Sequence, residues 1–188
     1  MSLAVRLRDH YRHRWGEPSR TGSFDFGDEV FVEICKWDSD RPKNTERVTL
    51  YATIGASLHP MKGADPSHRI ELVVGFDPPE DDVAGALAVL ASFPRRQGTS
   101  LEHGHTVPFG EPLWAGSGMR AFLVLRPNVS DLIPPMDVEN VHVDFLQAIP
   151  IYPSELEAKK TDGLTAFMDA WEEKKVPFWN PRRSPVPP

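Results

Sequence analysis

Residues 47–54 have the sequence RVTLYATI, in which two kinds of side chain alternate without a break. Successive side chains of an extended chain point to opposite sides, so the alternation sorts them onto two faces. One face holds Val48, Leu50, Ala52 and Ile54, and the other holds Arg47, Thr49, Tyr51 and Thr53. This pattern predicts a half-buried β-strand.

Further strand-like segments lie on both sides of this one. Residues 69–76 repeat the alternation, with Ile70, Leu72, Val74 and Phe76 as the apolar set. Residues 29–37 are rich in β-branched and aromatic side chains, residues 119–125 form a short apolar run, and residues 141–149 alternate again. All of these compositions are typical of strands, so we expect a sheet of several strands.

A helix is predicted at the N-terminus, over residues 3–15. Leu3, Leu7, Tyr11 and Trp15 are spaced four apart and share one helical face. That apolar face should dock on the rest of the domain, while the basic side chains between Arg6 and Arg14 form a solvated outer face.

A second helix is predicted after Pro78-Pro79. The acidic residues 80–82 suit the positive end of a helix dipole, and apolar residues follow at helical spacing from Val83. Pro94 should end this helix, because proline lacks the backbone donor that a helix interior needs.

Near the C-terminus, Ser154 and Glu157 match a capping box at the start of another helix. Asp162-Gly163 should interrupt that helix before a second amphipathic segment. The last residues, 181–188, have the sequence PRRSPVPP, and we expect them to form a flexible tail.

The predicted order is helix, strands, helix, strands and two helices, with no internal repeat. This order fits an α+β fold with a mixed, mostly antiparallel β-sheet flanked by helices, better than the strict alternation of a doubly wound fold. The chain has 188 residues, which is the size of one domain. We therefore expect residues 1–180 to form a single domain.

The composition excludes several classes of protein. With 21 Lys and Arg against 27 Asp and Glu, the net charge is −6, which argues against a nucleic-acid partner. No apolar run is long enough to span a membrane. A single cysteine, Cys35, allows no internal disulfide and fits a reducing compartment, so we expect a cytoplasmic protein.

His103 and His105 are the strongest candidates for metal chemistry. Side chains two apart in an extended segment share a face, but catalytic zinc needs a third protein ligand. His59, His68 or His142 would have to supply it from distant segments. We expect a solvent-facing turn instead, with Gly104 supplying backbone freedom, and keep a small metal-dependent hydrolase as an alternative function.

Other candidates for catalysis are incomplete. Ser117 lies directly between two glycines, which is not the spacing of a nucleophile elbow. Cys35 falls within a predicted strand, where a thiol behaves as a small apolar group. His142 and Asp144 share the polar face of their strand and can pair as a base and its orienting carboxylate, as on any surface strand. No phosphate-binding loop occurs, so we predict no catalytic, cofactor-binding or metal-binding residues.

Aromatic residues provide the remaining functional candidates. Several lie in loops or at the ends of predicted elements, where such side chains either anchor protein interfaces or close the core beneath loops, and the second is expected more often for any one of them. Together with the two histidines, the candidate interaction residues are Trp37, His103, His105, Trp114, Phe178 and Trp179.

The order of the elements and several short phrases resemble the suppressor of fused-like domain family. The phrases are LYATIGAS at 50–57, RIELV at 69–73, GHTVP at 104–108, FLVLRP at 122–127 and VDFLQAIPIYPSE at 143–155. They cover roughly residues 45–175 of the chain. Each phrase alone is strand sequence with turn glycines, and the specificity lies in their order and spacing.

The resemblance implies an α+β domain that binds other proteins and has no established catalytic residues. In animals such a domain is the N-terminal part of a regulator that sequesters a transcription factor. The C-terminal region that completes that regulator's cleft has no counterpart in these 188 residues, so that partner is not carried over.

Short stand-alone members are typical of bacteria, where the resemblance implies an immunity protein that neutralises a toxin domain of a polymorphic toxin system. The acidic balance suits a basic toxin domain, because opposite charge speeds association. A general assembly or regulatory subunit is a further alternative. The sequence leaves the oligomeric state open.

Overall fold

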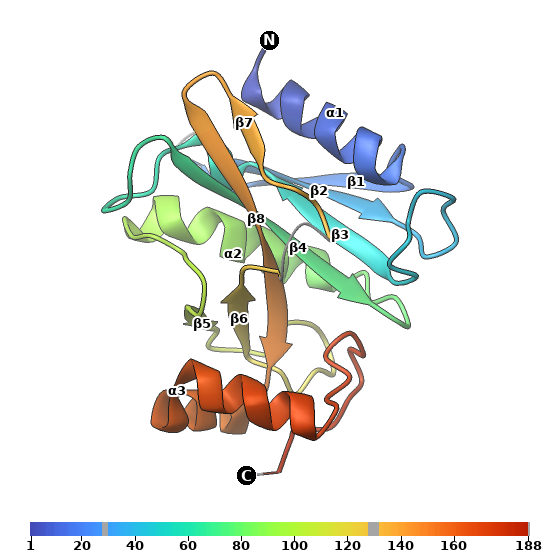
Figure 1. Cartoon of the computed structure of the whole chain (residues 1–188), viewed down its shortest axis with the longest axis vertical. Coiled ribbons are helices and arrows are strands. Elements are labelled where there is room, and N and C mark those ends of the chain that lie inside the picture. The colour runs from blue at the N-terminus through green and yellow to red at the C-terminus, as the bar shows by residue number, and fades with distance from the viewer. Residues whose placement is uncertain (28–29, 128–131, 188) are drawn as a thin grey trace.

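The computed structural model describes residues 1–27, 30–127 and 132–187 (Figure 1). Its helices are α1 (Leu3–Trp15), the short 3-10 helix η1 (Ala56–Leu58), α2 (Val83–Gln97) and α3 (Pro153–Glu173). Its strands are β1 (Arg20–Asp25), β2 (Phe31–Trp37), β3 (Thr49–Ile54), β4 (His68–Phe76), β5 (Thr106–Pro108), β6 (Ala121–Leu125), β7 (Met136–Val138) and β8 (Val141–Ile151). Within these ranges no helix is both long and apolar enough to cross a membrane.

The strands form one sheet of eight strands, in the order β1-β2-β3-β4-β8-β6-β5, with β7 also paired to β8. The pair β4–β8 is parallel and the other pairs are antiparallel. The predicted α+β fold with a mixed, mostly antiparallel sheet and flanking helices is therefore confirmed.

Two helices cover opposite faces of the sheet (Figure 1). On one face α1 packs against β2, β3 and β8, as predicted for the helix at 3–15. This core contains Leu7, Tyr11, Trp15, Trp37, Leu50, Ala52, Val143 and Phe145. On the other face α2 packs against β2, β3, β4 and β8, in a core that contains Ile34, Tyr51, Leu72, Leu87, Leu90 and Leu146.

The prediction of a half-buried strand at 47–54 was wrong, because every residue of β3 is buried. The alternation exists, but the polar face also lies under a helix. Tyr51 packs into the α2 core, and Thr53 finds polar partners inside the sheet. Hydroxyl groups can be buried at little cost when they are hydrogen-bonded, which hides such a face from a hydropathy pattern.

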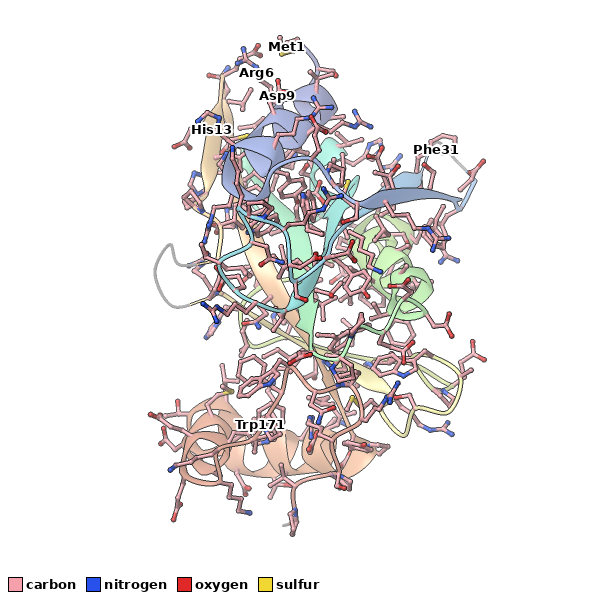
Figure 2. The ribbon with its side chains drawn as sticks, turned by 90° about the vertical axis from the view of Figure 1, so that its right-hand side faces the viewer. Met1, Arg6, Asp9, His13, Phe31 and Trp171 are labelled. Atoms are coloured by element: carbon pink, nitrogen blue, oxygen red, sulfur yellow. The ribbon has the colours of Figure 1, made fainter. Side chains whose placement is uncertain are left out.

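A third core forms at the far end of the molecule, where α3 covers the last residues of β8 and the strand β6 (Figure 1). Ile149 and Ile151 of β8 meet Phe167 and Trp171 of α3 there. Figure 2 shows Trp171 on the side of α3 that faces the body of the molecule. β8 is long enough, at 11 residues, to contribute to all three cores.

The predicted end of the second helix was wrong. Pro94 lies inside α2, which continues to Gln97. A proline removes only one ladder hydrogen bond, and the helix instead ends at Gly98, which has left-handed backbone angles (φ 62°, ψ 48°) and donates its N–H to the Pro94 carbonyl.

The predicted capping box of α3 is displaced by two residues. Tyr152 is the N-cap, and its N–H donates to Glu155 Oε2 at 2.9 Å, whereas the prediction paired Ser154 with Glu157. Pro153 explains the shift, because proline is favoured in the first turn. The predicted interruption lies at Gly163, whose φ of 82° kinks the helix.

The proline-rich segment 181–187 differs from the expected flexible tail, because it packs against the start of α3. Arg183 forms a two-pronged ion pair with Glu155, at 2.5 and 2.7 Å, and both side chains are 2% exposed. The Val186 N–H donates to the same carboxylate at 3.0 Å. A buried carboxylate needs such partners, and these come from the C-terminal segment.

Candidate protein-interaction site

Phe178 and Trp179 follow α3 in a turn that is tied to the sheet. The Phe178 N–H donates to the Val176 carbonyl at 2.9 Å, and the Asp77 N–H, at the end of β4, donates to the Trp179 carbonyl at 3.0 Å. The two rings meet edge to face, with centroids 5.2 Å apart. Phe178 packs on the α3 core, while Trp179 remains 43% exposed.

Trp179 and Phe178 line hollows on two sides, and we call these two residues the aromatic ridge. The first hollow has a volume of about 490 Å³ and lies beside α3, lined by His103, Met168, Asp169, Glu172, Lys175 and the ridge. The second, of about 430 Å³, is lined by Arg47, Val48, Leu50, Asp77, Leu132 and the ridge. A large exposed ring between two concave surfaces is the arrangement expected of an interface anchor.

His103 reaches the first hollow from the turn before β5. Its Nδ1 accepts a hydrogen bond from the Arg126 N–H at 2.9 Å, which fixes the ring. The turn depends on Gly104, as predicted: its φ is 83°, and a Cβ there would lie 2.8 Å from Leu164 Cδ2. Three of the candidate interaction residues, His103, Phe178 and Trp179, are thus brought together.

His105 is exposed but is not a lining residue of that hollow. Its Nδ1 accepts from the Glu102 N–H at 3.3 Å, so each histidine of the pair has one ring nitrogen engaged by backbone. Among the residues that the structure describes, no group of three or more His, Cys, Asp or Glu side chains is placed to hold a metal ion.

Trp37 and Trp114 do not contribute to an exposed surface, and this part of the prediction was wrong. Trp37 is 0% exposed, packs against Trp15 and donates its Nε1–H to the Gly16 carbonyl. Trp114 is 8% exposed and packs edge to face on Phe76. Both lie near element ends in the sequence, but helices and loops close over them.

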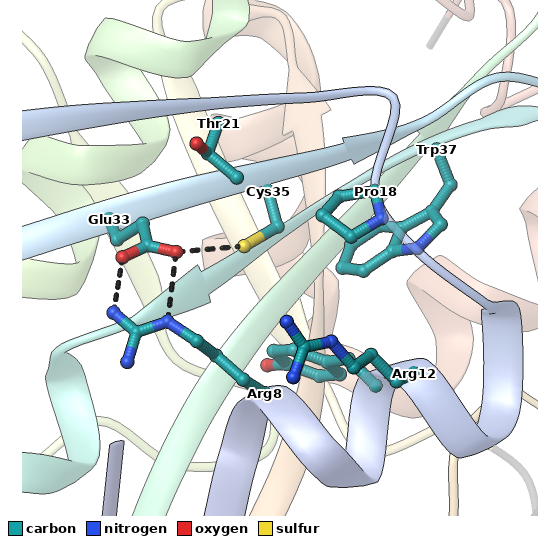
Figure 3. A pocket seen from close by; sticks show the side chains of 8 residues that line it. Arg8, Arg12, Pro18, Thr21, Glu33, Cys35 and Trp37 are labelled. Carbon is teal, nitrogen blue, oxygen red and sulfur yellow. Dashed lines mark hydrogen bonds and ion pairs between the residues drawn. The ribbon is translucent and has the colours of Figure 1, made fainter. Parts of the chain in front are cut away.

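Cys35 lies under α1, at the edge of a hollow between α1 and β1 (Figure 3). Its Sγ donates to Glu33, whose carboxylate pairs with Arg8. Burial raises the pKa of the Cys35 thiol far above its usual value, and the Glu33 charge adds to that rise. Cys35 is therefore a buried, protonated thiol with one hydrogen bond, close to the expectation for a strand cysteine.

His142 and Asp144 do form the pair that their strand positions suggested, 3.4 Å apart. Asp144 is also contacted by Arg126 at 2.8 Å and by His68 at 3.7 Å, while His142 Nδ1 bonds Asp137 at 2.6 Å. The Asp137 hydrogen bond raises the pKa of His142 above 6.5. These contacts form a surface ion network that joins β4, β7 and β8 to Arg126, just after β6.

Glu71 is a buried residue that the sequence did not single out. Its carboxylate, in the middle of β4, accepts hydrogen bonds from Thr53 Oγ1, the Gly55 N–H, and the Ser57 N–H and Oγ. Burial raises the pKa of Glu71, and these donors offset part of the rise. The carboxylate therefore holds the turn after β3, where a Cβ on Gly55 would lie 2.4 Å from the Phe31 carbonyl oxygen.

The Glu71 cluster gives a physical reason for the phrases LYATIGAS and RIELV. Thr53, Gly55 and Ser57 all lie in the first phrase, and Glu71 lies in the second. A buried carboxylate needs all of these donors at once. The two phrases are therefore coupled through one internal site that stabilises the fold.

Comparisons with known proteins agree with this description. The family model of the Suppressor of fused protein (SUFU) matches residues 29–184. No curated protein matches the sequence.

Among solved structures, the chain is similar to a putative SUFU homolog from Neisseria gonorrhoeae FA 1090, with a TM-score of 0.66, 18% identity, and coverage of 94% of this chain and 92% of that one. It is similar to a chain of the Sufu-Fu complex, with a TM-score of 0.64, 16% identity, and coverage of 88% and 82%. It also matches Drosophila Suppressor of Fused, with a TM-score of 0.58, 16% identity, and coverage of 84% of this chain but 43% of that one.

The TM-scores show the likeness of fold, and the family match extends over most of the sequence. The chain therefore belongs to the suppressor of fused family.

Proposed function

We propose that this chain is a non-enzymatic protein-binding domain and that the aromatic ridge is the centre of its contact surface. The observation that carries the proposal is the exposure of Trp179, at 43%, between two hollows on a backbone that is hydrogen-bonded to the sheet. A pre-positioned aromatic ring loses little conformational entropy on binding, so it suits an interface anchor.

The surroundings of the ridge resemble an interface more than an active site. The two hollows beside the ridge are lined by apolar residues such as Met168 and Val48 together with charged residues of both signs, among them Glu172 and Lys175. Protein interfaces usually combine apolar and charged side chains in this way. One of the similar structures is that of the Sufu-Fu complex, and the likeness of fold to it supports binding of another protein here.

The finer form of the proposal is that the chain acts as a cytoplasmic immunity protein and that its partner is a toxin domain. The net charge of −6 supports it, because a basic partner such as a nuclease domain would be attracted at long range. Under this proposal the protein carries no cofactor and catalyses no reaction.

The test starts with capture of partners from the native cell on the intact chain, followed by titration of the purified partner. Trp179→Ala should weaken the affinity of the chain for this partner at least about tenfold, as expected for a central anchor. Leu58→Ala, at an apolar residue of similar exposure (40%) on η1, is the matched control and should leave the affinity unchanged. Equal binding by Trp179→Ala and the intact chain would reject the ridge as the centre of the surface.

The immunity role has a separate readout. Co-expression of the intact chain should restore growth to cells that express the captured partner, and Trp179→Ala should restore it less. Capture of a partner that is harmless to cells would retain protein binding and reject immunity.

A further inference from the structure

The strand β1 is an edge strand that contributes very little to its own core. Five of its six residues are exposed, and only Phe24 is partly buried. β1 nevertheless pairs with β2 along its full length, from Arg20 opposite Lys36 to Asp25 opposite Phe31. Among the described residues no strand pairs with the other edge of β1.

The free edge of β1 presents backbone hydrogen-bonding groups. The Phe26 N–H donates to the Val30 carbonyl, so Phe26 faces β2. Alternate residues of an antiparallel strand direct their N–H and C=O groups to the same side. Thr21, Ser23 and Asp25 therefore direct theirs outward, and neither a proline nor a lysine lies within β1 to block pairing.

Hollows flank β1 on both faces of the sheet. On the α1 face, a hollow of about 320 Å³ lies between Thr21 and the two arginines Arg8 and Arg12 (Figure 3). On the α2 face, a hollow of about 210 Å³ lies beside Gly22, Phe24 and Lys36. A strand added to β1 would direct alternate side chains toward these two hollows, which is how strand addition gains specificity.

We infer that the occupant of this edge is β1 of a second copy of the same chain, paired antiparallel about a two-fold axis at Ser23. The residues whose backbone N–H and C=O groups point to the free edge must lie opposite one another in the two copies. A two-fold axis normal to the sheet then places the α1 faces of both copies on the same side of the joined sheet. With Ser23 opposite Ser23, Thr21 lies opposite Asp25, and Gly22 lies opposite Phe24.

The sequence RTGSFD complements itself in this register. Gly22 has nothing within 4 Å of an added Cβ, so the Phe24 ring of the second copy has open space to cover. An aromatic side chain across from an edge glycine is a recognised stabilising pair.

Polar side chains of the two copies would meet on the α1 face. Asp25 of one copy would lie beside Thr21 of the other, at a hollow lined by Arg8, Arg12 and Glu33. Arg8 pairs there with Glu33, and Arg12 pairs with Asp9 and Glu17. Phe31, 57% exposed at the outer end of β2, neighbours Asp25 and would be carried toward the same hollow (Figure 2). The same pairing would thus bring the Asp25 carboxylate and the exposed Phe31 ring to a hollow that Tyr11 and Trp37 also line.

The direct test is a cysteine on the axis. Directly opposite residues of such a pair have Cα atoms about 5.5 Å apart, within disulfide range. Ser23→Cys should form a cross-linked dimer of twice the chain's 21.1 kDa under mild oxidation. His13→Cys, exposed on α1 away from β1, is the matched control and should form no cross-link, since the native Cys35 is buried.

A second pair of variants separates strand pairing from misfolding. Ser23→Pro removes a backbone N–H that points to the free edge, and an edge strand tolerates a proline at such a position. Ser23→Thr keeps this N–H. In light scattering at submillimolar concentration, the intact chain and Ser23→Thr should have the mass of a dimer, and Ser23→Pro should have the mass of a monomer. Circular dichroism should show that Ser23→Pro is still folded. Two results together would overturn the inference: an intact chain that is monomeric, and a Ser23→Cys variant that cross-links no faster than His13→Cys. The free edge of β1 would then be available to pair with a strand of another protein.

The inference does not depend on the proposed partner surface. The hollows beside the aromatic ridge and the hollows beside β1 have no lining residue in common. Trp179→Ala should therefore leave the dimer intact, and loss of dimerisation in Ser23→Pro should leave the ridge available.

Discussion

At the scale of single residues, Glu71 shows how a buried carboxylate can hold a turn of the fold. A charge buried inside a sheet is costly unless donors surround it. Thr53, Gly55 and Ser57 supply those donors from one turn. The sequence offered the residues but not their convergence, since a glutamate within an alternating strand normally indicates a solvent-facing position.

His142 gives a pH-dependent prediction. Its hydrogen bond to Asp137 raises the pKa of the imidazole above 6.5, and the Asp144 charge adds to the rise. A raised pKa means that the folded state favours the protonated ring. The resulting stabilisation is present in full below pH 6.5 and is lost as the pH rises through the pKa of the folded state. It should amount to no more than a few tenths of a kcal/mol, because the side chain is 41% exposed.

The measurement is an NMR titration of the His142 ring. Asp137→Asn should lower the pKa of His142 toward 6.5, because the neutral amide no longer favours the imidazolium. Asp40→Asn, in an exposed loop, should leave the titration unchanged. A pKa of His142 that is insensitive to Asp137→Asn would show that the 2.6 Å contact does not hold the proton.

At the scale of elements, the predictable parts are those with one apolar face. The helix at 3–15 and the strands at 69–76 and 141–149 have such faces, and they correspond to α1, β4 and β8. The strand predicted at 29–37 from its composition corresponds to β2, Phe31–Trp37. β1 was missed because a strand exposed on both sides carries no hydropathy pattern, and β7 was missed because three residues are too few to show one. Trp37 and Trp114 were assigned to the surface because burial under another element is not a local property.

The packing of the C-terminal segment 181–187 was not predicted, for a related reason. Its prolines indicate irregular structure correctly, but irregular structure can still be packed. Arg183 inserts between the rings of Trp171 and Tyr152, at 4.9 and 5.2 Å, and neutralises Glu155. The fold therefore uses residues 181–187 to complete the start of α3.

Arg183→Ala should destabilise the protein by about 3–5 kcal/mol, because it leaves the Glu155 carboxylate buried without its counter-ion. Arg182→Ala changes the exposed neighbour with the same chemistry and should cost less than about 0.5 kcal/mol. Urea unfolding of both variants gives the comparison. Equal stabilities would mean that the tail is dispensable, as its composition first indicated.

At the scale of the whole molecule, the parallel pairing of β4 with β8 determines the architecture. Strands joined by local hairpins can be predicted from their order, but β4 and β8 are separated by α2, β5, β6 and β7. No local pattern records that pairing. It places β8 in the interior of the sheet, so that α1 and α3 cover successive parts of one of its faces while α2 covers the other.

This central position of β8 predicts that the three cores unfold together. Val143 and Phe145 belong to the α1 core, Leu146 and Ala148 to the α2 core, and Ile149 and Ile151 to the α3 core. A strand cannot leave one core without disturbing the adjacent ones, because its register is continuous. Opening of any core should therefore be global unfolding.

Hydrogen exchange measures this directly. Phe145→Ala, in the α1 core, should cost about 3–5 kcal/mol and accelerate exchange of the most protected amides about 10²-fold or more. The acceleration should be equal in β6 and α3, although neither contacts Phe145 within its core. Val5→Ala, at a 39% exposed position of α1, should change neither set. If the amides of α3 kept their protection in Phe145→Ala, the third core would be an independent folding unit, and β8 would connect the cores without coupling them.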